Sequence, residues 1–151
     1  MRDVAVELGP EGDAVERVLR AAGFEAASAS PWARVVEARE GTFEDATPLV
    51  SWVLEGGVLG ICGGTGPLLA ALHLTPGEAP VEGPVEASAP EAPSVEIAEA
   101  RPVTGVGYAL YRAPRGCVAL AGRRGRGWVV YALEPGLLAA SLSWVASRGP
   151  P

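Results

Sequence analysis

The sequence predicts a single α/β domain, a three-layer sandwich with a mostly parallel central sheet and an antiparallel excursion toward the C-terminus. Three observations predict this fold class. Residues 2–29 follow the order strand, helix, strand, which favours parallel pairing. The continuous apolar run at residues 58–62 is typical of a central strand covered on both faces. Strand patterns separated by turns fill residues 95–133 and predict the antiparallel part.

The first elements are set by short-range patterns. Apolar residues within 2–8 predict a strand, which a Gly-Pro pair ends. Residues 13–22 carry apolar side chains at helical spacing, and Gly23 follows them as a candidate C-cap. Residues 24–29 then give a short second strand.

The middle of the chain repeats the alternation. Residues 34–38 predict a third strand and residues 42–55 a helix, in which Pro48 falls near the first turn, where proline is tolerated. Two glycines end that helix before the central strand 58–62. A further helix over residues 67–74 is expected to begin with a proline in its first turn.

Residues 75–94 differ in composition, with five prolines and four glutamates. We expect a long loop or flap with short extended pieces, because loops of this length in a compact domain are uncommon and tend to be functional or disordered. The later strand patterns cover residues 95–99, 103–111, 117–121 and 128–133. Apolar residues at helical spacing predict a final helix over residues 137–147. Residues 1–151 are therefore expected to form one domain.

Charge and hydropathy exclude two classes of partner. The net charge of −6 argues against nucleic acid, which requires a basic surface. The arginines at 123, 124 and 126 are expected at a solvated hairpin tip. No basic segment followed by an apolar one opens the chain, and no apolar stretch reaches the roughly 18 residues of a membrane span. We expect no membrane partner and a cytoplasmic location.

Residue usage is biased. The 12 basic residues are all arginine, and the chain lacks lysine, asparagine and glutamine. This thermophile-like composition fits a hot-growing source or GC-rich codon usage equally well. Two cysteines are too few for a disulfide framework. We expect no cofactor and no metal site.

One motif in the sequence is typical of a catalytic nucleophile. The predicted strand 58–62 ends in Gly60-Ile61-Cys62-Gly63-Gly64 and leads into a predicted helix, the pattern of a nucleophile elbow with sulfur in place of oxygen. A helix N-terminus lowers the pKa of a thiol, and its backbone N–H groups can hold an oxyanion. Cys62 is the candidate nucleophile, with Gly60, Gly63 and Gly64 as small backbone positions around it. The alternative is a structural cysteine beside a glycine turn that packing requires.

Residues 58–64 resemble the nucleophile segment of class I glutamine amidotransferases, and residues 128–139 resemble the last strand and helix of that family. The resemblance implies a flavodoxin-like fold in which a His and a Glu beside a proline complete a triad with the cysteine. Here Glu134 precedes Pro135 where the family has its His, and Gly136 stands in place of the Glu. The single histidine, His73, lies about three helical turns, roughly 16 Å, beyond Cys62, too far to act as its base.

We therefore expect a degenerate amidotransferase-like domain that is non-catalytic or repurposed to bind a small-molecule ligand or a partner protein; whether it is an enzyme stays open. The alternative is a cysteine-dependent hydrolase or deglycase-like enzyme in which Cys62 acts with Glu11 or Glu134, because deglycase relatives carry a glutamate after their first strand. Glu11 can equally be an acid that favours a helix N-terminus. A homodimer is expected by analogy with the family.

A second resemblance concerns the loop after the cysteine. Gly63-Gly64-Thr65-Gly66 is similar to the loop of ferredoxin-reductase nicotinamide domains. Those domains follow a flavin-binding barrel, which this chain lacks. A Walker loop is excluded because the chain has no lysine to contact phosphate.

Overall fold

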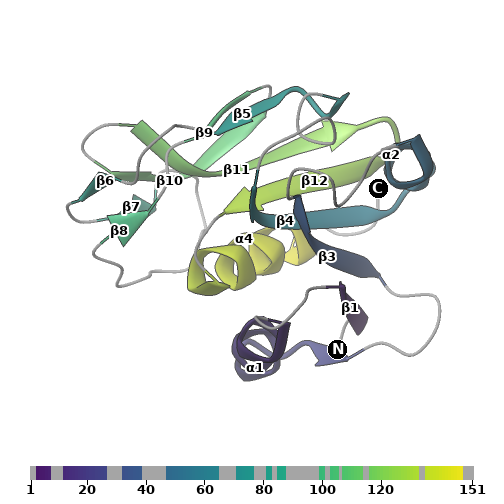
Figure 1. The fold of residues 1–151 in the computed structure, drawn as a ribbon, viewed down its shortest axis with the longest axis horizontal. Helices are drawn as coiled ribbons and strands as arrows, with labels where there is room; N and C mark the ends of the chain where they lie inside the picture. Colours follow the sequence, from purple (N-terminus) through teal and green to yellow (C-terminus); the bar gives the residue numbers. More distant parts are fainter. Residues whose placement is uncertain are drawn as a thin grey trace.

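The structure is a computed structural model, shown in Figure 1. It describes residues 3–7, 12–26, 32–38, 47–64, 71–76, 81–82, 85–87, 99–100, 103–105, 107–113, 116–132 and 135–147. The helices are α1 (Gly12–Ala21), α2 (Thr47–Leu54) and α4 (Pro135–Ser147). The strands are β1 (Asp3–Glu7), β2 (Glu25–Ala26), β3 (Ala33–Ala38), β4 (Val58–Gly64), β5 (Leu74–Pro76), β6 (Val81–Glu82), β7 (Glu86–Ala87), β8 (Glu99–Ala100), β9 (Val103–Gly105), β10 (Tyr108–Ala113), β11 (Gly116–Arg124) and β12 (Gly127–Ala132).

An eight-stranded sheet in the order β2-β1-β3-β4-β12-β11-β10-β7 forms the centre of the described structure. Its first five strands pair in parallel, and β11, β10 and β7 continue it in antiparallel pairing. In the parallel half, Ala33, Val58 and Trp128 lie at one level across β3, β4 and β12. These three strands therefore begin along a common edge, and this edge positions the site described below.

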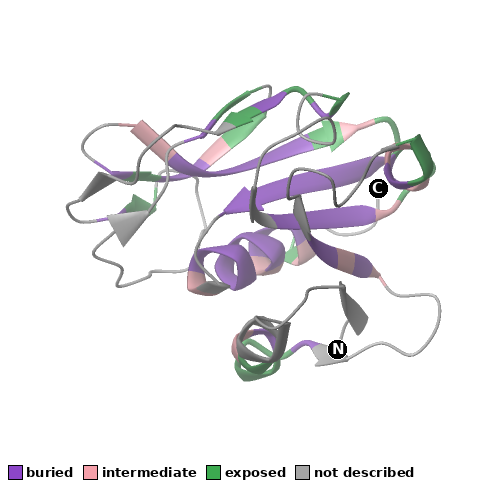
Figure 2. Cartoon of the chain, viewed as in Figure 1, coloured by how far each residue is buried: buried purple, intermediate pink, exposed green. Residues whose placement is uncertain are grey.

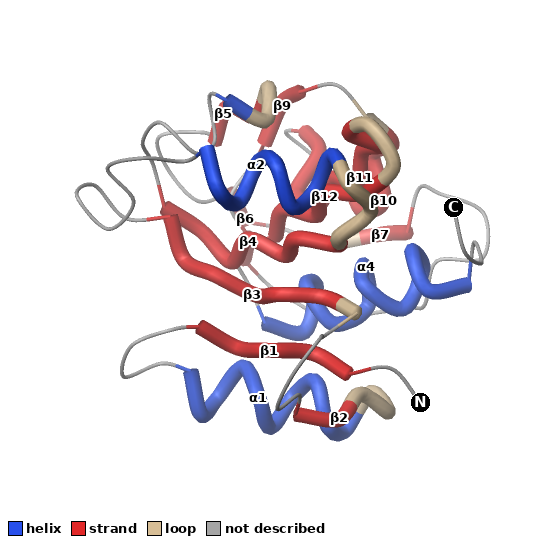
Figure 3. The backbone as a smooth tube through the Cα atoms, turned by 90° about the vertical axis from the view of Figure 1, so that its right-hand side faces the viewer, coloured by secondary structure: helices blue, strands red, loops and turns tan. Residues whose placement is uncertain are grey.

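Helices cover both faces of this sheet (Figure 3). Helix α4 contacts β12, β11 and β4 on one face and packs against α1, while α2 contacts β12 and β4 on the other face. Both faces of β12 are thus covered, and every residue of this strand is buried, as Figure 2 shows. This accounts for the near-continuous apolar sequence of β12 and of the first half of β4.

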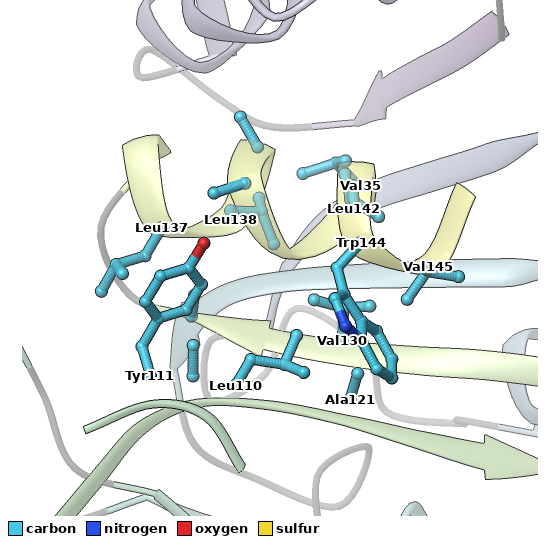
Figure 4. Packing of buried hydrophobic residues seen from close by; sticks show 14 of the residues in the cluster. Val35, Leu110, Tyr111, Ala121, Val130, Leu137, Leu138, Leu142, Trp144 and Val145 are labelled. Carbon is cyan, nitrogen blue, oxygen red and sulfur yellow. The ribbon is translucent and has the colours of Figure 1, made fainter. Parts of the chain in front are cut away.

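Two hydrophobic clusters lie on the two faces of the sheet. The larger one joins α4 to β12, β11 and β10, and Figure 4 shows Leu137, Leu138 and Leu142 of α4 beside Val130 and Tyr111. The smaller one lies under α2, with Leu49 and Val53 of that helix against Leu59, Ile61 and Val129 of the sheet. Because α4 is apolar on most of its circumference, it forms a buried helix rather than an amphipathic surface helix.

The predicted mostly parallel, flavodoxin-like sandwich is wrong. Among the described strands, four pairings are parallel, namely β1 with β2, β1 with β3, β3 with β4, and β4 with β12. Five are antiparallel: three extend the central sheet, and two form the small sheets β5–β9 and β6–β8. The sheet structure is therefore rich in antiparallel pairing. The sequence did not indicate this share of antiparallel pairing, because strands of two residues are too short to show an alternation of apolar and polar side chains.

The observed bounds of several elements can be compared with the predicted ones. Leu74, expected at a helix end, begins β5 instead. The short extended pieces expected within 75–94 include the end of β5 and the whole of β6 and β7. The single strand expected over 103–111 is two strands, β9 and β10, which belong to different sheets. The hairpin tip expected at the arginines 123, 124 and 126 is only the pair Gly125-Arg126, since β11 continues to Arg124. The helical start at 42–46 and residues 65–70 lie outside the described part.

The described helices include none long and apolar enough to cross a membrane.

The core predicts a loss of stability at high pH. Tyr111 is fully buried in β10, and burial raises its pKa to about 12. An unfolded tyrosine ionises near pH 10, so above that pH the unfolded state has fewer bound protons than the folded state. The free energy of unfolding should therefore fall as the pH rises from about 10 to about 12. Urea unfolding at pH 9, 10 and 11 would measure this fall in the free energy of unfolding.

The Tyr111→Phe variant should show a smaller fall, because it has no phenol to ionise. Tyr108→Phe is the matched control, since the Tyr108 ring lies largely in solvent. If Tyr111→Phe lost stability with pH as steeply as the wild type, Tyr111 would not be the group responsible.

Candidate functional site

An open pocket of about 370 Å³ lies at the edge where β3 and β4 begin. Its lining consists of Trp32, Trp52, Glu55, Gly56 and Gly57. Trp32 immediately precedes β3, whereas the other four belong to the end of α2 and the turn into β4. Two half-exposed indole rings and one exposed carboxylate therefore face a common space.

Trp32 is held by an aromatic partner. Its ring stacks on the Phe24 ring, with centroids 5.9 Å apart and planes within 9° of parallel. Phe24 is buried between α1 and β2, so the ring behind Trp32 is anchored in the larger core cluster. Such stacked pairs contribute about 0.5–1.5 kcal/mol beyond the burial of area. The Trp32 side of the pocket is consequently preformed.

The Trp52 ring is held in place by the backbone of Gly57 and by the guanidinium of Arg34. A Cβ added to Gly57 would lie 2.5 Å from the indole carbons, so the glycine backbone lies directly against the ring. The Gly57 amide donates a hydrogen bond of 3.0 Å to the Trp52 carbonyl oxygen, which closes the end of α2. The guanidinium of Arg34, on β3, lies 5.4 Å from the centroid of the Trp52 ring. At this distance a cation is attracted to the face of an indole.

The β11–β12 hairpin supports the rear of the pocket. The Arg126 amide donates to the Leu54 carbonyl oxygen at 3.0 Å, and the Trp128 amide donates to the Gly57 carbonyl oxygen at 3.1 Å. Gly56, between them, has a φ of +129°, a backbone conformation that side chains rarely adopt. The turn that carries Glu55 is thus fixed by hydrogen bonds from a second element.

This combination of groups suits a ligand with an apolar face and hydroxyl groups. Ligand pockets are generally apolar and aromatic with a few polar groups that orient the ligand, and volumes of roughly 300 to 1,000 Å³ are usual. The indoles offer flat apolar contact, and the Glu55 carboxylate accepts hydrogen bonds from hydroxyl groups. Within the part of the chain that the structure describes, no three His, Cys, Asp or Glu side chains gather as metal ligands would.

The predicted nucleophile segment lies at the opposite end of the sheet. The backbone of β4 stays extended through Cys62 and Gly63 to Gly64, which pairs with Ala38 of β3. The Cys62 side chain lies outside the described part, as do the residues Glu11 and Glu134. Their proposed roles, together with those of Gly63 and Gly64, stay predictions.

Gly60 has a packing role that the structure does describe. It is buried in β4, and a Cβ there would lie 3.3 Å from a methyl of Val35 and 3.4 Å from a methyl of Leu138. The small residue therefore lets α4 approach the sheet closely. This favours the packing explanation of that glycine over an oxyanion role.

Five other residues from the sequence analysis can be placed. His73 is exposed in a turn before β5, with a φ of 59°. Arg123 and Arg126 are exposed, as expected of a hairpin tip, but Arg124 is half-buried and its Nε donates to the Leu72 carbonyl oxygen at 3.0 Å. Burial lowers the pKa of Arg124. Cys117, in β11, is half-buried; burial raises the pKa of its thiol, which makes it a poor nucleophile.

The sequence contained a signal for the pocket that the motif analysis missed. The chain has four tryptophans. Trp32 and Trp128 lie where β3 and β12 begin, and Trp52 and Trp144 lie near the ends of α2 and α4, which run back to the same edge. Once the strand and helix boundaries are known, all four tryptophans map to one edge of the sheet.

Comparisons with known proteins give relatives by structure alone. No protein-family model matches the sequence, and no curated protein matches it either. The structure is similar to the β-galactosidase of Rahnella sp. R3, with a TM-score of 0.63, 14% identity, and coverage of 97% of this chain and 31% of that one. It is also similar to the exo-β-1,4-mannosidase Op5Man5 of an Opitutaceae bacterium, strain TAV5, with a TM-score of 0.58, 14% identity, and coverage of 97% and 33%. The β-galactosidase of Marinomonas ef1 gives a TM-score of 0.60, 16% identity, and coverage of 97% and 28%.

These matches correct the family assignment. The three solved structures named above are glycosidases, so the assignment to class I glutamine amidotransferases is wrong. The function drawn from it is overturned as well, both as a repurposed amidotransferase and as a cysteine-dependent hydrolase or deglycase. The elbow motif misled because a glycine at this strand end also has a packing explanation, as the close approach of α4 to Gly60 shows. At this level of identity the likeness shows the fold alone, shared with about a third of each glycosidase chain.

Proposed function

We propose that this chain is a carbohydrate-binding accessory domain that acts beside a glycosidase. The ligand class is β-galactosides or β-mannosides, because the similar structures are a β-galactosidase and an exo-β-1,4-mannosidase. The chain spans about a third of the length of those enzymes, so the activity of the whole enzymes is not transferred to it.

The observation that carries the proposal is the pocket of Trp32, Trp52 and Glu55. The axial C–H groups of a hexose form an apolar face that stacks on an indole, while its hydroxyl groups need hydrogen-bond acceptors. A carboxylate gives stronger hydrogen bonds than a neutral acceptor. Because the rings are held by Phe24, Gly57 and Arg34, little ordering cost remains to be overcome on binding.

Tryptophan fluorescence tests the proposal directly. The protein is titrated with methyl β-D-galactopyranoside and with β-1,4-mannobiose, and we expect one of them to shift the emission in a saturable manner. Trp52→Ala should weaken that binding about tenfold or more, as expected for the loss of roughly 1.4 kcal/mol or more of contact energy. Glu55→Gln should weaken it less, because the amide still accepts a hydrogen bond through its oxygen.

Glu86→Gln is the matched control, since Glu86 is an exposed glutamate on β7, away from the pocket. Circular dichroism confirms that each variant is folded. The proposal fails if neither sugar binds the wild type, or if Glu86→Gln weakens binding as much as Glu55→Gln.

A cytoplasmic location is kept as part of the proposal, on the sequence features given above. Fractionation of the source cells would check it.

A further inference from the structure

A second aromatic surface lies on the same edge of the sheet as the pocket. It consists of Tyr108, Trp128, Trp144 and Arg123, and we refer to it as the tyrosine platform. The Tyr108 ring lies 5.7 Å from the Trp144 ring and 6.3 Å from the Trp128 ring, and the two indoles meet edge to face at 5.9 Å. The Arg123 guanidinium lies 5.5 Å from the Trp128 centroid.

Exposure differs sharply within the platform. Tyr108 is 59% exposed, whereas Trp128 is 6% and Trp144 is 4% exposed. The two indoles therefore support a phenol ring that lies at the surface. A large aromatic side chain gains little stability from this position, because it keeps most of its apolar area in water. An aromatic ring fixed from behind and open in front is a suitable surface for stacking.

The backbone next to Tyr108 is specialised. Gly107 has a φ of +153°, and a Cβ there would lie 2.6 Å from the Ala121 carbonyl oxygen. The register between β10 and β11 shifts between Ala109 and Tyr111. Irregularities of this kind redirect side chains in a sheet. Here the irregular start of β10 accompanies the outward position of Tyr108.

The platform and the pocket lie in one row. Ala33, Val58 and Trp128 share a level at the start of β3, β4 and β12. Strand β10 begins at Tyr108 and runs in the same direction as β12. Four strand spacings separate β3 from β10 in the sheet. At about 4.8 Å for each spacing, the two strands lie roughly 19 Å apart, and the Tyr108 ring extends back toward β12, where it lies 6.3 Å from the Trp128 ring. A ligand of several linked hexoses can follow this edge from the pocket to the platform.

We propose that the tyrosine platform is a second sugar subsite and that the natural ligand is a β-linked oligosaccharide spanning platform and pocket. This inference rests on the proposed function. The Tyr108 ring stacks on one sugar residue, and the exposed guanidinium of Arg123 beside it donates hydrogen bonds to hydroxyl groups. Two linked subsites raise the affinity for a ligand that reaches both, without any new contact at either site.

Calorimetry with ligands of two lengths tests the inference. The full chain is titrated with a methyl β-glycoside of the sugar that the pocket prefers, and with the corresponding β-1,4-linked tetrasaccharide. The wild type should bind the tetrasaccharide at least tenfold more tightly. Tyr108→Ala should remove this gain and leave the affinity for the monosaccharide glycoside unchanged. Tyr108→Phe, which keeps the ring, should retain most of the gain.

The outcomes separate the two proposals. If Tyr108→Ala leaves the tetrasaccharide affinity unchanged, the platform is not a subsite, while the pocket proposal stands. An equal loss for both ligands would also overturn the inference, because it indicates a change of fold. If neither ligand binds the wild type, the proposed function fails and takes the platform proposal with it. If Tyr108→Ala changes sedimentation of the protein rather than sugar binding, the surface is a protein interface instead.

Discussion

Replacing Leu138 with alanine is expected to lower the free energy of unfolding by about 2–5 kcal/mol. Leu138 is fully buried on the face of α4 that meets the sheet (Figure 4). One of its methyl groups would lie 3.4 Å from a Cβ at Gly60. Alanine would leave a void between α4 and β4, because the surrounding core residues relax only partly into it.

Urea unfolding followed by circular dichroism measures this loss. Leu54→Ala is the matched control, because Leu54 is 47% exposed at the end of α2 and should change stability by no more than about 0.5 kcal/mol. Equal losses for Leu138→Ala and Leu54→Ala would mean that α4 is not packed on the sheet as described.

The second large effect is expected for Gly127→Ala. A Cβ at Gly127 would overlap the carbonyl oxygens of Val53 and Gly57, which are backbone atoms fixed by α2 and by the turn into β4. Relief would require the β11–β12 hairpin to move away from α2. Overpacking of this kind costs about 1–3 kcal/mol and occasionally more. Thermal unfolding should show a clearly lower midpoint.

Gly60→Ala is the comparison for that variant, because its Cβ would meet only side-chain methyl groups at 3.3 Å or more. Those groups can shift, and alanine also reduces the entropy of the unfolded chain, which stabilises by about 0.4–1 kcal/mol. We expect a change within about 1 kcal/mol of the wild type. A Gly60→Ala loss as large as that of Gly127→Ala would contradict this account of the close backbone contact.

The elements predicted best are those whose sequence pattern is long and whose ends carry a specific residue. The helix expected over 13–22 is α1 (Gly12–Ala21), and Gly23 has the positive φ, +97°, of a helix C-cap. The helix expected over 137–147 is α4 (Pro135–Ser147), with proline at its start. In these segments local propensity and tertiary packing agree, so the sequence alone is sufficient.

The elements predicted poorly depend on distant partners. Strands β5, β6 and β7 are two or three residues long, and each pairs with a strand far away in sequence. Periodicity cannot be read from two residues, so the segment 75–94 was expected to be a loop with short extended pieces, and the partners of those pieces could not be predicted. The antiparallel share of the sheet was underestimated for the same reason.

The pocket could not be predicted because it is built from residues with no common motif. Trp32 and Trp52 are 20 positions apart, and they face the same space only because β3 and β4 pair with Ala33 level with Val58. The glycine-rich motif instead indicated a site at Cys62, a few residues along the same strand toward its other end. The pairing register that joins the two indoles is a property of the folded sheet.

The short strands at the two ends of the central sheet have a consequence for association. The sheet ends on β2 and on β7, each two residues long; β2 pairs with Asp3 and Val4 of β1, and β7 pairs with Tyr111 and Arg112 of β10, so among the described strands each border is stepped rather than long and flat. Long flat borders invite edge-to-edge polymerisation, and very short ones are a known protection against it. The stepped border of the described strands therefore disfavours edge-to-edge addition of further strands, even though the interior strands are strongly apolar.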